Sequence, residues 1–443
     1  MPYGQGLASL GLQTVYRAFN EPASISAERF FLPDEGSGEK GPIVTYETGR
    51  PVSEARIIAF SVSHEPQLAA VAALLRQAGI DPIREQRKAA DPLVLVGGPL
   101  TIVDPLLFHH LADAVAVGEG EPLFIPLRRL LESCSDKQEF LAEVSRLAGV
   151  YVPAMRPGSA PSPARADQSM LPAVGCIVSP LSELKDMFLV EAARGCPYAC
   201  TFCVIGGKRG GDFRPVAMEK ILGAVPPWAR KVGLVGAAVT SHPDIEAILD
   251  AFIGRNVEVS VASLRADRLT PSLMERLKAA GIRTVTIAAD GSSERMRERL
   301  RKGITGDQLL GAADLARASG FRRLKLYAMV GLPDEDDADL KELVMLCREM
   351  SRRAPLTVAV QAFVPKPGTP LSGFVPLPVP EMERRLAYLK KKLAGVARLQ
   401  GTSAKWSWIE YRIAHAGIEA GLIAARAADG GSTLAAWKRA LAP

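Results

Sequence analysis

The sequence predicts an α/β protein with two blocks of alternating strands and helices, followed by a helical extension. Short apolar runs alternate with helical patterns between residues 55 and 117, and the same alternation returns between residues 187 and 364. Such alternation is typical of parallel sheets covered by helices, so we expect a doubly wound parallel sheet in the first block. The expected segments are a first domain at 1–150, a linker at 151–182, a second domain at 183–375 and a helical extension at 376–443.

The composition is that of a globular protein. The 443 residues are 48% hydrophobic, enough for two or three domain cores, and 23% charged, which argues against wholesale disorder. The net charge of +6 is spread along the chain, so we expect no nucleic-acid partner. The chain lacks a basic start followed by an apolar run, and it lacks a long apolar stretch. We therefore expect a cytoplasmic protein that does not span a membrane.

The first block contains candidate ligand-binding turns. We expect strands at 55–62, 92–96 and 112–117, and a helix at 67–78. The second and third strands are each followed by a glycine turn, with the candidate residues Gly97, Gly98, Gly118 and Glu119. Ligands of parallel sheets bind beyond the carboxyl ends of the strands, where glycine lets a backbone approach closely. Ordinary strand-to-helix turns are the alternative interpretation.

The second block contains six βα units, after a connector rich in Pro, Ser and Ala at 152–180. The expected helices include 271–280 and 307–318. The expected strands cover 187–192, 231–236, 258–263, 284–289, 323–331 and 356–364. Functional groups of such folds gather at the carboxyl ends of the strands. After this block we expect an amphipathic helix with a basic face at 380–399, and helices with core aromatic residues at 403–442.

Three cysteines follow the first strand of the second block with the spacing C-x-x-x-C-x-x-C: Cys196, Cys200 and Cys203. Soft thiolates select iron–sulfur clusters or zinc. A closed zinc site needs four ligands, and no fourth Cys or His follows at the spacing of a zinc finger. Three thiolates therefore leave one metal position open, and Phe202 is expected to shield the site from water. A zinc site completed by a distant residue and three unrelated thiols are the alternatives.

The remaining cysteines are scattered, and we expect them to be inert buried thiols: Cys134, Cys176 and Cys347.

The segment RGCPYACTFC matches the signature of the radical S-adenosylmethionine (SAM) family. The resemblance implies a partial (β/α)6 barrel with a [4Fe–4S] cluster on the three cysteines. It also implies that SAM binds the open iron through its amino and carboxylate groups. An external electron donor of the flavodoxin or ferredoxin type then reduces the cluster, and SAM is cleaved to a radical.

The segments YGQGLASLGLQTVY, LVLVGGP and VAVGEGE resemble the Rossmann-like N-terminal domain of cobalamin-binding radical SAM proteins. The first strand of that domain would precede Tyr3, so the predicted sheet lacks all or part of it. The cobalamin motif D-x-H-x-x-G is absent, and we expect His64, His109 and His110 to be surface or capping residues. Three alternatives stay open: cobalamin is bound without a histidine ligand, it is bound weakly, or it is absent.

The same resemblance implies SAM contacts at the strand ends of the second block. It assigns Gly236 and Ala237 to the SAM amino group, and Ser263 and Arg265 to the end of the third strand, where an Arg can pair with the SAM carboxylate. Further candidates are Asp290 for the ribose, Ser292 after it at a helix start, and Val330 and Gly331 for the adenine. Helix capping is the alternative for Asp290 and Ser292, and a surface position is expected for Lys302.

These features predict an enzyme that cleaves SAM and acts on an organic substrate. The first expectation is cobalamin-dependent methyl transfer to an unactivated carbon. Two alternatives remain: a cobalamin-independent radical SAM enzyme that rearranges, couples or sulfur-modifies its substrate, and a non-catalytic iron–sulfur or zinc protein. Sulfur-inserting relatives carry a second cysteine cluster, and none is visible in this sequence.

Overall fold

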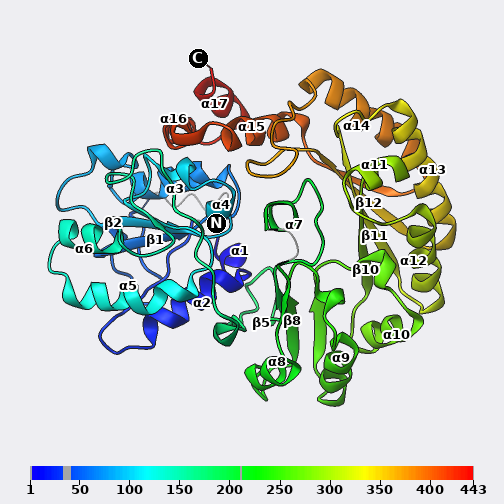
Figure 1. The fold of residues 1–443 in the computed structure, drawn as a ribbon, viewed down its shortest axis with the longest axis horizontal. Coiled ribbons are helices and arrows are strands. Elements are labelled where there is room, and N and C mark those ends of the chain that lie inside the picture. Colours follow the sequence, from blue (N-terminus) through cyan, green and yellow to red (C-terminus); the bar gives the residue numbers. More distant parts are fainter. Residues whose placement is uncertain (1, 33–40, 210–211, 443) are drawn as a thin grey trace. The chain divides into compact units, whose positions relative to one another are not determined.

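The computed structural model describes residues 2–32, 41–209 and 212–442, and the chain divides into two compact units. The first unit combines Met1–Asp186 with Arg412–Pro443, and the second covers Met187–Tyr411 (Figure 1). The unit boundary at residue 186 lies close to the expected start of the second domain. The expected extension is divided differently, because residues 376–411 belong to the second unit and the rest to the first. None of the helices in the described ranges has the length and apolar character needed to cross a membrane.

The first unit is built on a four-stranded sheet in the order β1-β2-β3-β4. The first three strands are parallel and β4 is antiparallel to β3. The strands are β1 (Ile57–Ser61), β2 (Leu93–Gly97), β3 (Ala114–Ala116) and β4 (Val150–Tyr151). The helices are α1 (Tyr3–Leu7), α2 (Leu10–Asn20), α3 (Gln67–Gln77), α4 (Leu100–Val103), α5 (Glu121–Ser133), α6 (Lys137–Val144), α16 (Ala420–Asp429) and α17 (Leu434–Ala440). Short 3-10 turns lie at η1 (Val52–Glu54), η2 (Arg84–Gln86), η3 (Pro105–Phe108), η4 (Gln168–Met170) and η7 (Gly417–Glu419).

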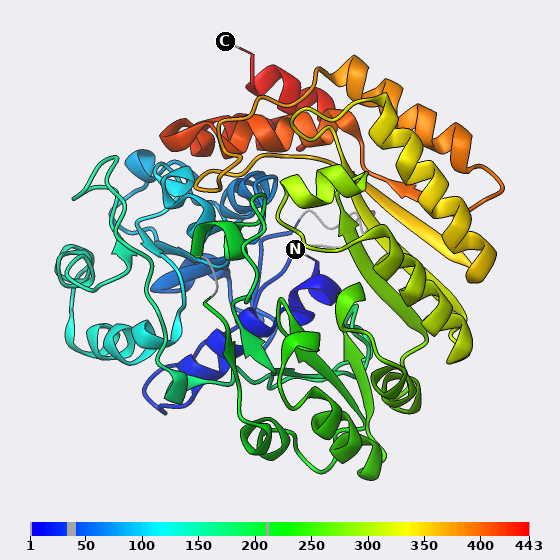
Figure 2. The same ribbon diagram turned by 45° about the vertical axis from the view of Figure 1, so that its right-hand side comes forward.

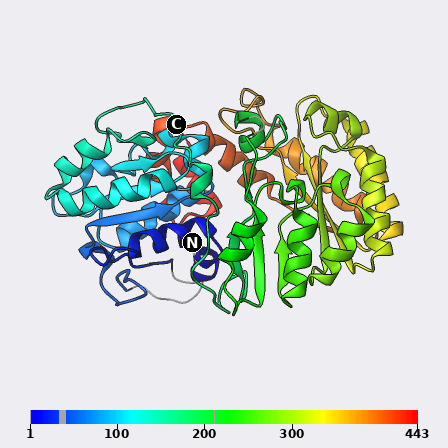
Figure 3. The ribbon, with the colours of Figure 1, turned by 60° about the horizontal axis from the view of Figure 1, so that its bottom comes forward.

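Both faces of this sheet are covered. On one face, Leu93 of β2 packs in a core with residues of α5 and α6. The next residue, Val94, is fully buried on the opposite face, as expected from the alternation of side chains along a strand. Helix α3 lies on one side of the sheet and α2 and α5 on the other (Figures 1 and 3). Helix α16 packs along α3, where Arg76 donates a hydrogen bond to Ala425 O at 2.9 Å and pairs with Asp429.

The second unit contains the βα repeats as two parallel ladders, β5-β8-β9 and β10-β11-β12-β13. A single bridge between Leu264 and Ile287 joins them. The strands are β5 (Phe188–Glu191), β8 (Lys231–Val235), β9 (Glu258–Val261), β10 (Thr284–Asp290), β11 (Arg323–Val330), β12 (Leu356–Ala362) and β13 (Arg398–Gly401). The six predicted strands are thus confirmed, with ends that differ from the predictions by a few residues.

Helices lie on the outer side of these strands (Figures 1 and 2). They are α8 (Met218–Ala224), α9 (Ile245–Gly254), α10 (Pro271–Ala279), α12 (Gly306–Ala318), α13 (Asp337–Arg353) and α14 (Val379–Leu393). The unit also contains α11 (Glu294–Arg299), the short turns η5 (Val239–Ser241) and η6 (Ala266–Arg268), and most of α15 (Ala404–Ala414), which continues past the unit boundary at Tyr411. Along β10 and β11 buried residues alternate with half-buried ones. One face of the sheet therefore packs on the helices, and the side chains of the other face are half-buried.

The chain after the sixth strand differs from the prediction. Helix α14 ends at Leu393, not at residue 399, because Ala394 leaves the helical conformation and Gly395 takes a positive φ of 74°. The chain then forms β13, which extends the barrel sheet parallel to β12. The sequence of β13, RLQG, lacks an apolar run, and three of its four residues are exposed. An edge strand of this kind gives no hydrophobic pattern to predict it from.

Candidate functional site

The three candidate cysteines lie on one excursion of the chain beyond β5. The excursion leaves through β6 (Ala193–Arg194), contains the helix α7 (Val204–Arg209) and returns through β7 (Arg214–Pro215), which pairs antiparallel with β6. Gly195 opens it with a φ of 77°, and a Cβ there would lie 1.6 Å from Asp212 O. Only glycine fits this position without moving the backbone.

Cys200 is the most enclosed of the three thiols, with 7% of its surface exposed, whereas Cys196 and Cys203 are half-buried. The excursion contacts the segment after α11, because Thr201 N donates to Leu300 O at 3.0 Å and Cys200 Sγ lies 3.8 Å from Arg301 O. Burial raises the pKa of both Cys196 and Cys200, and nearby Arg265 and Lys302 act in the opposite direction. Two cations near these thiols favour their thiolate forms, which are the metal-binding forms.

The three thiols suit a cluster better than a single ion. Within the ranges that the structure describes, their sulfur atoms do not all lie within 4.8 Å of one another, as ligands of one ion would. A multi-iron cluster holds each thiolate on a different iron and so accepts a wider spacing. Three thiolates on one loop fit a [4Fe–4S] cluster that leaves one iron open.

Arg265 connects the cysteine loop to the barrel. Its guanidinium stacks on the Tyr198 ring at 3.6 Å from the centroid and donates to Lys302 O at 2.9 Å. It also forms a two-point contact with Asp267, at 2.9 and 3.1 Å. The Tyr198 hydroxyl in turn lies 3.0 Å from Ser241 Oγ. In this structure Arg265 positions the loop, and its pairing with a SAM carboxylate stays a prediction.

Sequence reasoning missed Tyr198, although its place between two of the cysteines was a signal.

Asp290 and Lys302 form an ion pair on the half-buried face of the sheet. Lys302 Nζ lies 2.6 Å from Asp290 Oδ2, and the two side chains are 11% and 15% exposed. Asp290 ends β10 at a bulge and has a φ of 60°. The prediction that Lys302 is a surface lysine is wrong, because the turn after α11 carries it back toward the strand end. Capping by Asp290 or Ser292 is also wrong, since Ser293 is the N-cap of α11.

Ser292 belongs to a buried polar network at the end of β11. Its hydroxyl donates to Glu335, which also accepts from Gly331 N at 2.6 Å and from Arg385 at 2.7 Å. Burial raises the pKa of Glu335, and the three donors act against burial. Gly331 has a φ of 82°, and a Cβ there would lie 2.2 Å from Met382 Cε. The network fixes the turn that carries the predicted adenine contacts.

The other candidates of the second unit lie on the cysteine excursion, in the case of Phe202, or at strand ends. Phe202 packs against an apolar cluster that includes Leu332 and Phe363, and Val330 is fully buried. Gly236 follows β8, and a Cβ there would lie 2.9 Å from Ala193 O. Ala237 and Ser263 are exposed. The structure thus places Cys200 near enough to Cys203, Arg265, Asp290 and Lys302 for their charges to interact, and Cys196 near enough to Cys203, Arg265 and Lys302. It places Ser292 and Gly331 in the neighbouring network.

In the first unit, the predicted turns contact the chain's own backbone. A Cβ on Gly98 would lie 2.7 Å from Val62 N, and one on Gly118 would lie 2.5 Å from Ala164 O. Glu119 accepts a hydrogen bond from Ala166 N at 2.7 Å, whereas Gly97 is less crowded. Residues of the expected linker therefore cover the Gly118–Glu119 turn. The close backbone contacts account for Gly98 and Gly118 without a ligand, and cobalamin binding stays a prediction.

Two expectations about single residues in this unit have different outcomes. His109 is 8% exposed and bonds Tyr151, so it is not a surface residue, but it occupies the C-cap position of η3, where its N donates to Leu106 O, as the capping alternative expects. The expectation for Cys176 is wrong. Cys176 is exposed, because the segment that carries it lies on α2, where Cys176 N donates to Gln13 at 2.8 Å.

Comparisons with known proteins agree with the described geometry. Residues 11–153 match the family of N-terminal domains of radical SAM proteins, and residues 190–347 match the radical SAM superfamily. An uncharacterized protein of Methanocaldococcus jannaschii is 34% identical over 41% of this chain and 41% of its own length. An uncharacterized methyltransferase of Pyrococcus horikoshii is 25% identical over 63% of this chain and 62% of its own length. The chain thus spans less than two thirds of either relative.

A further relative and a solved structure show weaker likeness. A putative methylthiotransferase of M. jannaschii is 24% identical over 69% of this chain and 68% of its own length. The apo structure of the cobalamin-dependent SAM radical enzyme OxsB has a TM-score of 0.49 at 16% identity, over 77% of this chain and 47% of that one. The two family matches, together with the cysteine loop at the end of β5, show that this chain carries a radical SAM core domain at residues 190–347 preceded by an N-terminal domain of radical SAM proteins at residues 11–153.

Proposed function

We propose that the protein is a radical SAM enzyme that cleaves SAM at a [4Fe–4S] cluster held by Cys196, Cys200 and Cys203. The observation that carries the proposal is the single excursion that holds all three thiols beyond β5, where the sulfur atoms are not grouped as closely as the ligands of one ion would be. The chemistry that a bound cluster supplies is one-electron cleavage of SAM, which yields a radical able to abstract hydrogen from an organic substrate. A flavodoxin or ferredoxin is the proposed electron source.

The residues of this chain bind and orient in this proposal. Arg265 holds the cysteine loop through Tyr198 and the Lys302 carbonyl. The proposed SAM contacts are Gly236, Ala237, Ser263 and Asp290, which lie at the ends of β8, β9 and β10. The turn at Val330 and Gly331 is the proposed adenine contact, and Phe202 with its apolar neighbours excludes water from that side.

Methyl transfer to an unactivated carbon is the outcome that we propose. Its support is the Pyrococcus relative, which is called a methyltransferase. The crowded turns at Gly98 and Gly118 give no support to cobalamin as the methyl carrier, so the proposal does not depend on it. A cobalamin absorbance band that co-purifies with the protein and passes into the filtrate on denaturation would show that the corrinoid is bound. Loss of methyl transfer in protein produced without the corrinoid would show that transfer is cobalamin-dependent.

Cobalamin-independent rearrangement, coupling or sulfur modification is the second candidate. The relative called a putative methylthiotransferase supports sulfur modification. Against it, the described residues contain no second group of closely spaced cysteines, since Cys134, Cys176 and Cys347 do not cluster.

The deciding experiment uses anaerobically reconstituted full-length protein with dithionite and SAM. We expect 5′-deoxyadenosine or S-adenosylhomocysteine by mass spectrometry, and loss of both products in the triple variant Cys196→Ala, Cys200→Ala, Cys203→Ala. The exposed Cys176→Ala variant is the matched control and should keep full turnover. Unchanged products in the triple variant would overturn the proposal. A stable cluster that never cleaves SAM would favour a non-catalytic iron–sulfur protein.

A further inference from the structure

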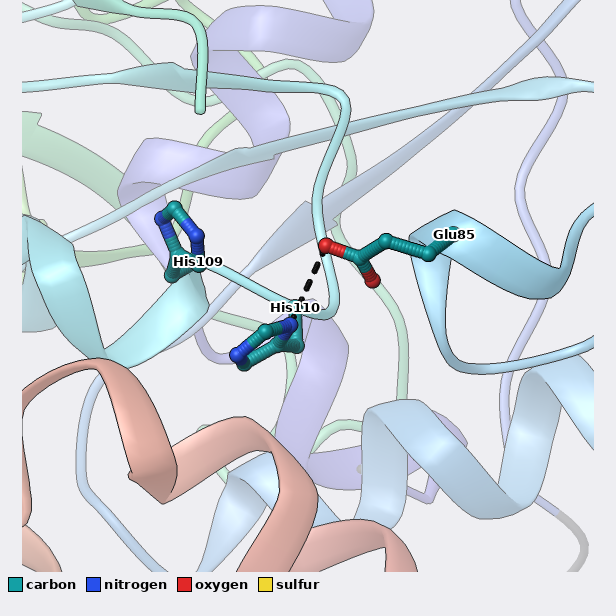
Figure 4. Close-up of side chains that lie close together, drawn as sticks. All are labelled: Glu85, His109 and His110. Carbon is teal, nitrogen blue, oxygen red and sulfur yellow. Dashed lines mark hydrogen bonds and ion pairs between the residues drawn. The ribbon is translucent and has the colours of Figure 1, made fainter. Parts of the chain in front are cut away.

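Two adjacent histidines and a glutamate meet at the surface of the first unit. Glu85 lies in η2, and His109 and His110 follow η3 directly. One nitrogen of each imidazole and one carboxylate oxygen of Glu85 all lie within 4.8 Å of one another. Figure 4 shows the two rings and the carboxylate converging from these two segments. Within the described residues, this is the one set of three or more such donors that approach so closely.

The three side chains have the geometry of ligands of one ion. His110 Nδ1 lies 3.1 Å from Glu85 Oε1, a separation that suits two neighbouring corners of a tetrahedron around zinc, given ligand distances of about 2.0–2.2 Å. His109 Nδ1 lies 2.7 Å from the Tyr151 hydroxyl. A metal-bound histidine commonly uses one ring nitrogen for the metal and the other for such a hydrogen bond, which fixes the ring.

The setting is partly buried and contains charges of both signs. His109 is 8% exposed, whereas the side chains of His110 and Glu85 are 20% and 40% exposed, so an ion could enter from solvent. The rings of His109 and His110 pack edge to face at 4.7 Å between centroids. Glu419 of η7 lies near enough to act electrostatically on His109 and would favour a cation.

Arg84 acts against a cation, because its guanidinium pairs with the same Glu85 carboxylate at 2.5 Å.

We propose that Glu85, His109 and His110 bind a divalent transition-metal ion of the zinc class, with a fourth position left to water. Imidazole nitrogens select zinc and its neighbours over magnesium and calcium, and two histidines with one carboxylate make a known zinc ligand set. The ion would join η2 to the end of η3 and so stabilise the first unit by mass action. Arg84 would give up part of its contact with Glu85 when the ion binds. This site is separate from the cysteine loop, and its existence does not depend on the proposed reaction.

The test separates this site from the cysteines. The triple cysteine-to-alanine variant, dialysed against chelator, is titrated with Zn²⁺ by calorimetry, and Co²⁺ spectra identify nitrogen and oxygen ligands. We expect one equivalent of zinc to bind. His110→Gln and Glu85→Gln should each weaken binding by at least tenfold, and Tyr151→Phe by about tenfold or more through loss of the bond to His109. Arg84→Ala should strengthen binding, because it frees the carboxylate.

Matched controls keep the test independent of folding. His64→Gln changes an exposed histidine of the same unit and should leave zinc affinity unchanged. Circular dichroism should show the same secondary structure in every variant, since His110 and Glu85 are partly exposed. Absence of stoichiometric zinc binding, or affinity that is unchanged by both His110→Gln and Glu85→Gln, would overturn the proposal. Either result would leave SAM cleavage by the cysteine-containing protein untouched.

Discussion

Single residues at close backbone contacts decide whether the cysteine loop can form. Gly195 combines a φ of 77° with a hydrogen that points at Asp212 O. A side chain at a left-handed position costs about 1–3 kcal/mol by itself, and the overlap must also be relieved by moving one of the two backbones. Because Gly195 directly precedes Cys196, that movement displaces the first thiol.

Gly195→Ala should therefore lose most of its reconstituted iron and sulfide. The matched variant is Gly223→Ala in α8, where a Cβ meets no atom within 4 Å and φ is not positive. That change should leave cluster content as in the parent and slightly stabilise the helix, since alanine is the better helix former. Iron and sulfide analysis, together with the absorbance of the cluster, measures the cluster content of the two variants. Full cluster content in Gly195→Ala would show that the loop tolerates the shift.

Glu335 illustrates how a buried charge depends on its partners. Glu335→Gln keeps the size of the side chain but leaves the Arg385 guanidinium, 9% exposed, with the more exposed Glu381 as its negatively charged partner. Breaking a buried ion pair from one side costs about 3–5 kcal/mol, and Glu381 offsets part of that cost, so we expect a loss of about 3 kcal/mol in the free energy of unfolding by urea. Glu349→Gln breaks the exposed pair with Arg352 and should cost at most about 1 kcal/mol. Equal losses in the two variants would contradict this account.

Helix starts in the second unit are tied to neighbouring elements by carboxylates. Asp339, in the first turn of α13, accepts from Ser293 Oγ at 2.6 Å and from Asp336 N at 2.8 Å, so the caps of α11 and α13 share one carboxylate. Burial would raise the pKa of Asp339, but the bonds from Ser293, Asp336 and Arg295 prevail and lower it below 3.8. A lowered pKa means that the unfolded chain binds the proton more readily than the folded one.

Stability contributed by Asp339 is therefore present above about pH 4 and is lost as the pH falls through the lower folded pKa. Asp339→Asn should be less stable than the parent at pH 7, and the difference between the two should shrink as the pH falls from about 5 toward 3. Urea unfolding at several pH values gives the stability of the parent and of Asp339→Asn as a function of pH. A difference that stays constant over that range would show that the carboxylate charge contributes nothing.

Local patterns predicted elements well and long-range pairs poorly. The strands of the barrel follow from buried apolar runs, which depend on neighbouring residues only, and the three thiols follow from their spacing. The pairing of Ser292 with Glu335 spans 43 positions, and that of Arg385 with Glu335 spans 50. The surface position predicted for Lys302 fails because of such a pairing, since nothing near Lys302 in sequence shows that Asp290 is its partner. Strand β13 escaped prediction because its edge position requires no apolar pattern.

At the scale of the whole molecule, the first unit is assembled from two distant parts of the chain. Residues 412–443 belong to it, and α16 presents fully buried alanines, including Ala424, to a packed interior along α3. Helix α3 itself carries many buried apolar residues, with Leu68, Ala72 and Leu75 fully or almost fully buried. The stability of the first unit therefore depends on its last segment.

Ala424→Glu should destabilise the first unit by at least about 3 kcal/mol, because it buries a charge without a partner. Ala435→Glu, at an exposed position in the first turn of α17, should be neutral or slightly stabilising. Proteolysis followed by mass spectrometry locates the damage, and new cuts should appear in residues 1–186 before they appear in the barrel. Cuts confined to residues 187–411 would contradict the assignment of this helix to the first unit.

The split of the first unit has a consequence for biosynthesis. The ribosome releases residues 187–411 as one uninterrupted segment, so the barrel has all its strands before the last helices are made. The amino-terminal part emerges first, but the side of α3 that packs along α16 stays uncovered until α16 is synthesised, some 350 positions later. Nascent chains thus expose this side of α3 throughout most of translation. We expect it to be the surface that most needs a ribosome-associated chaperone.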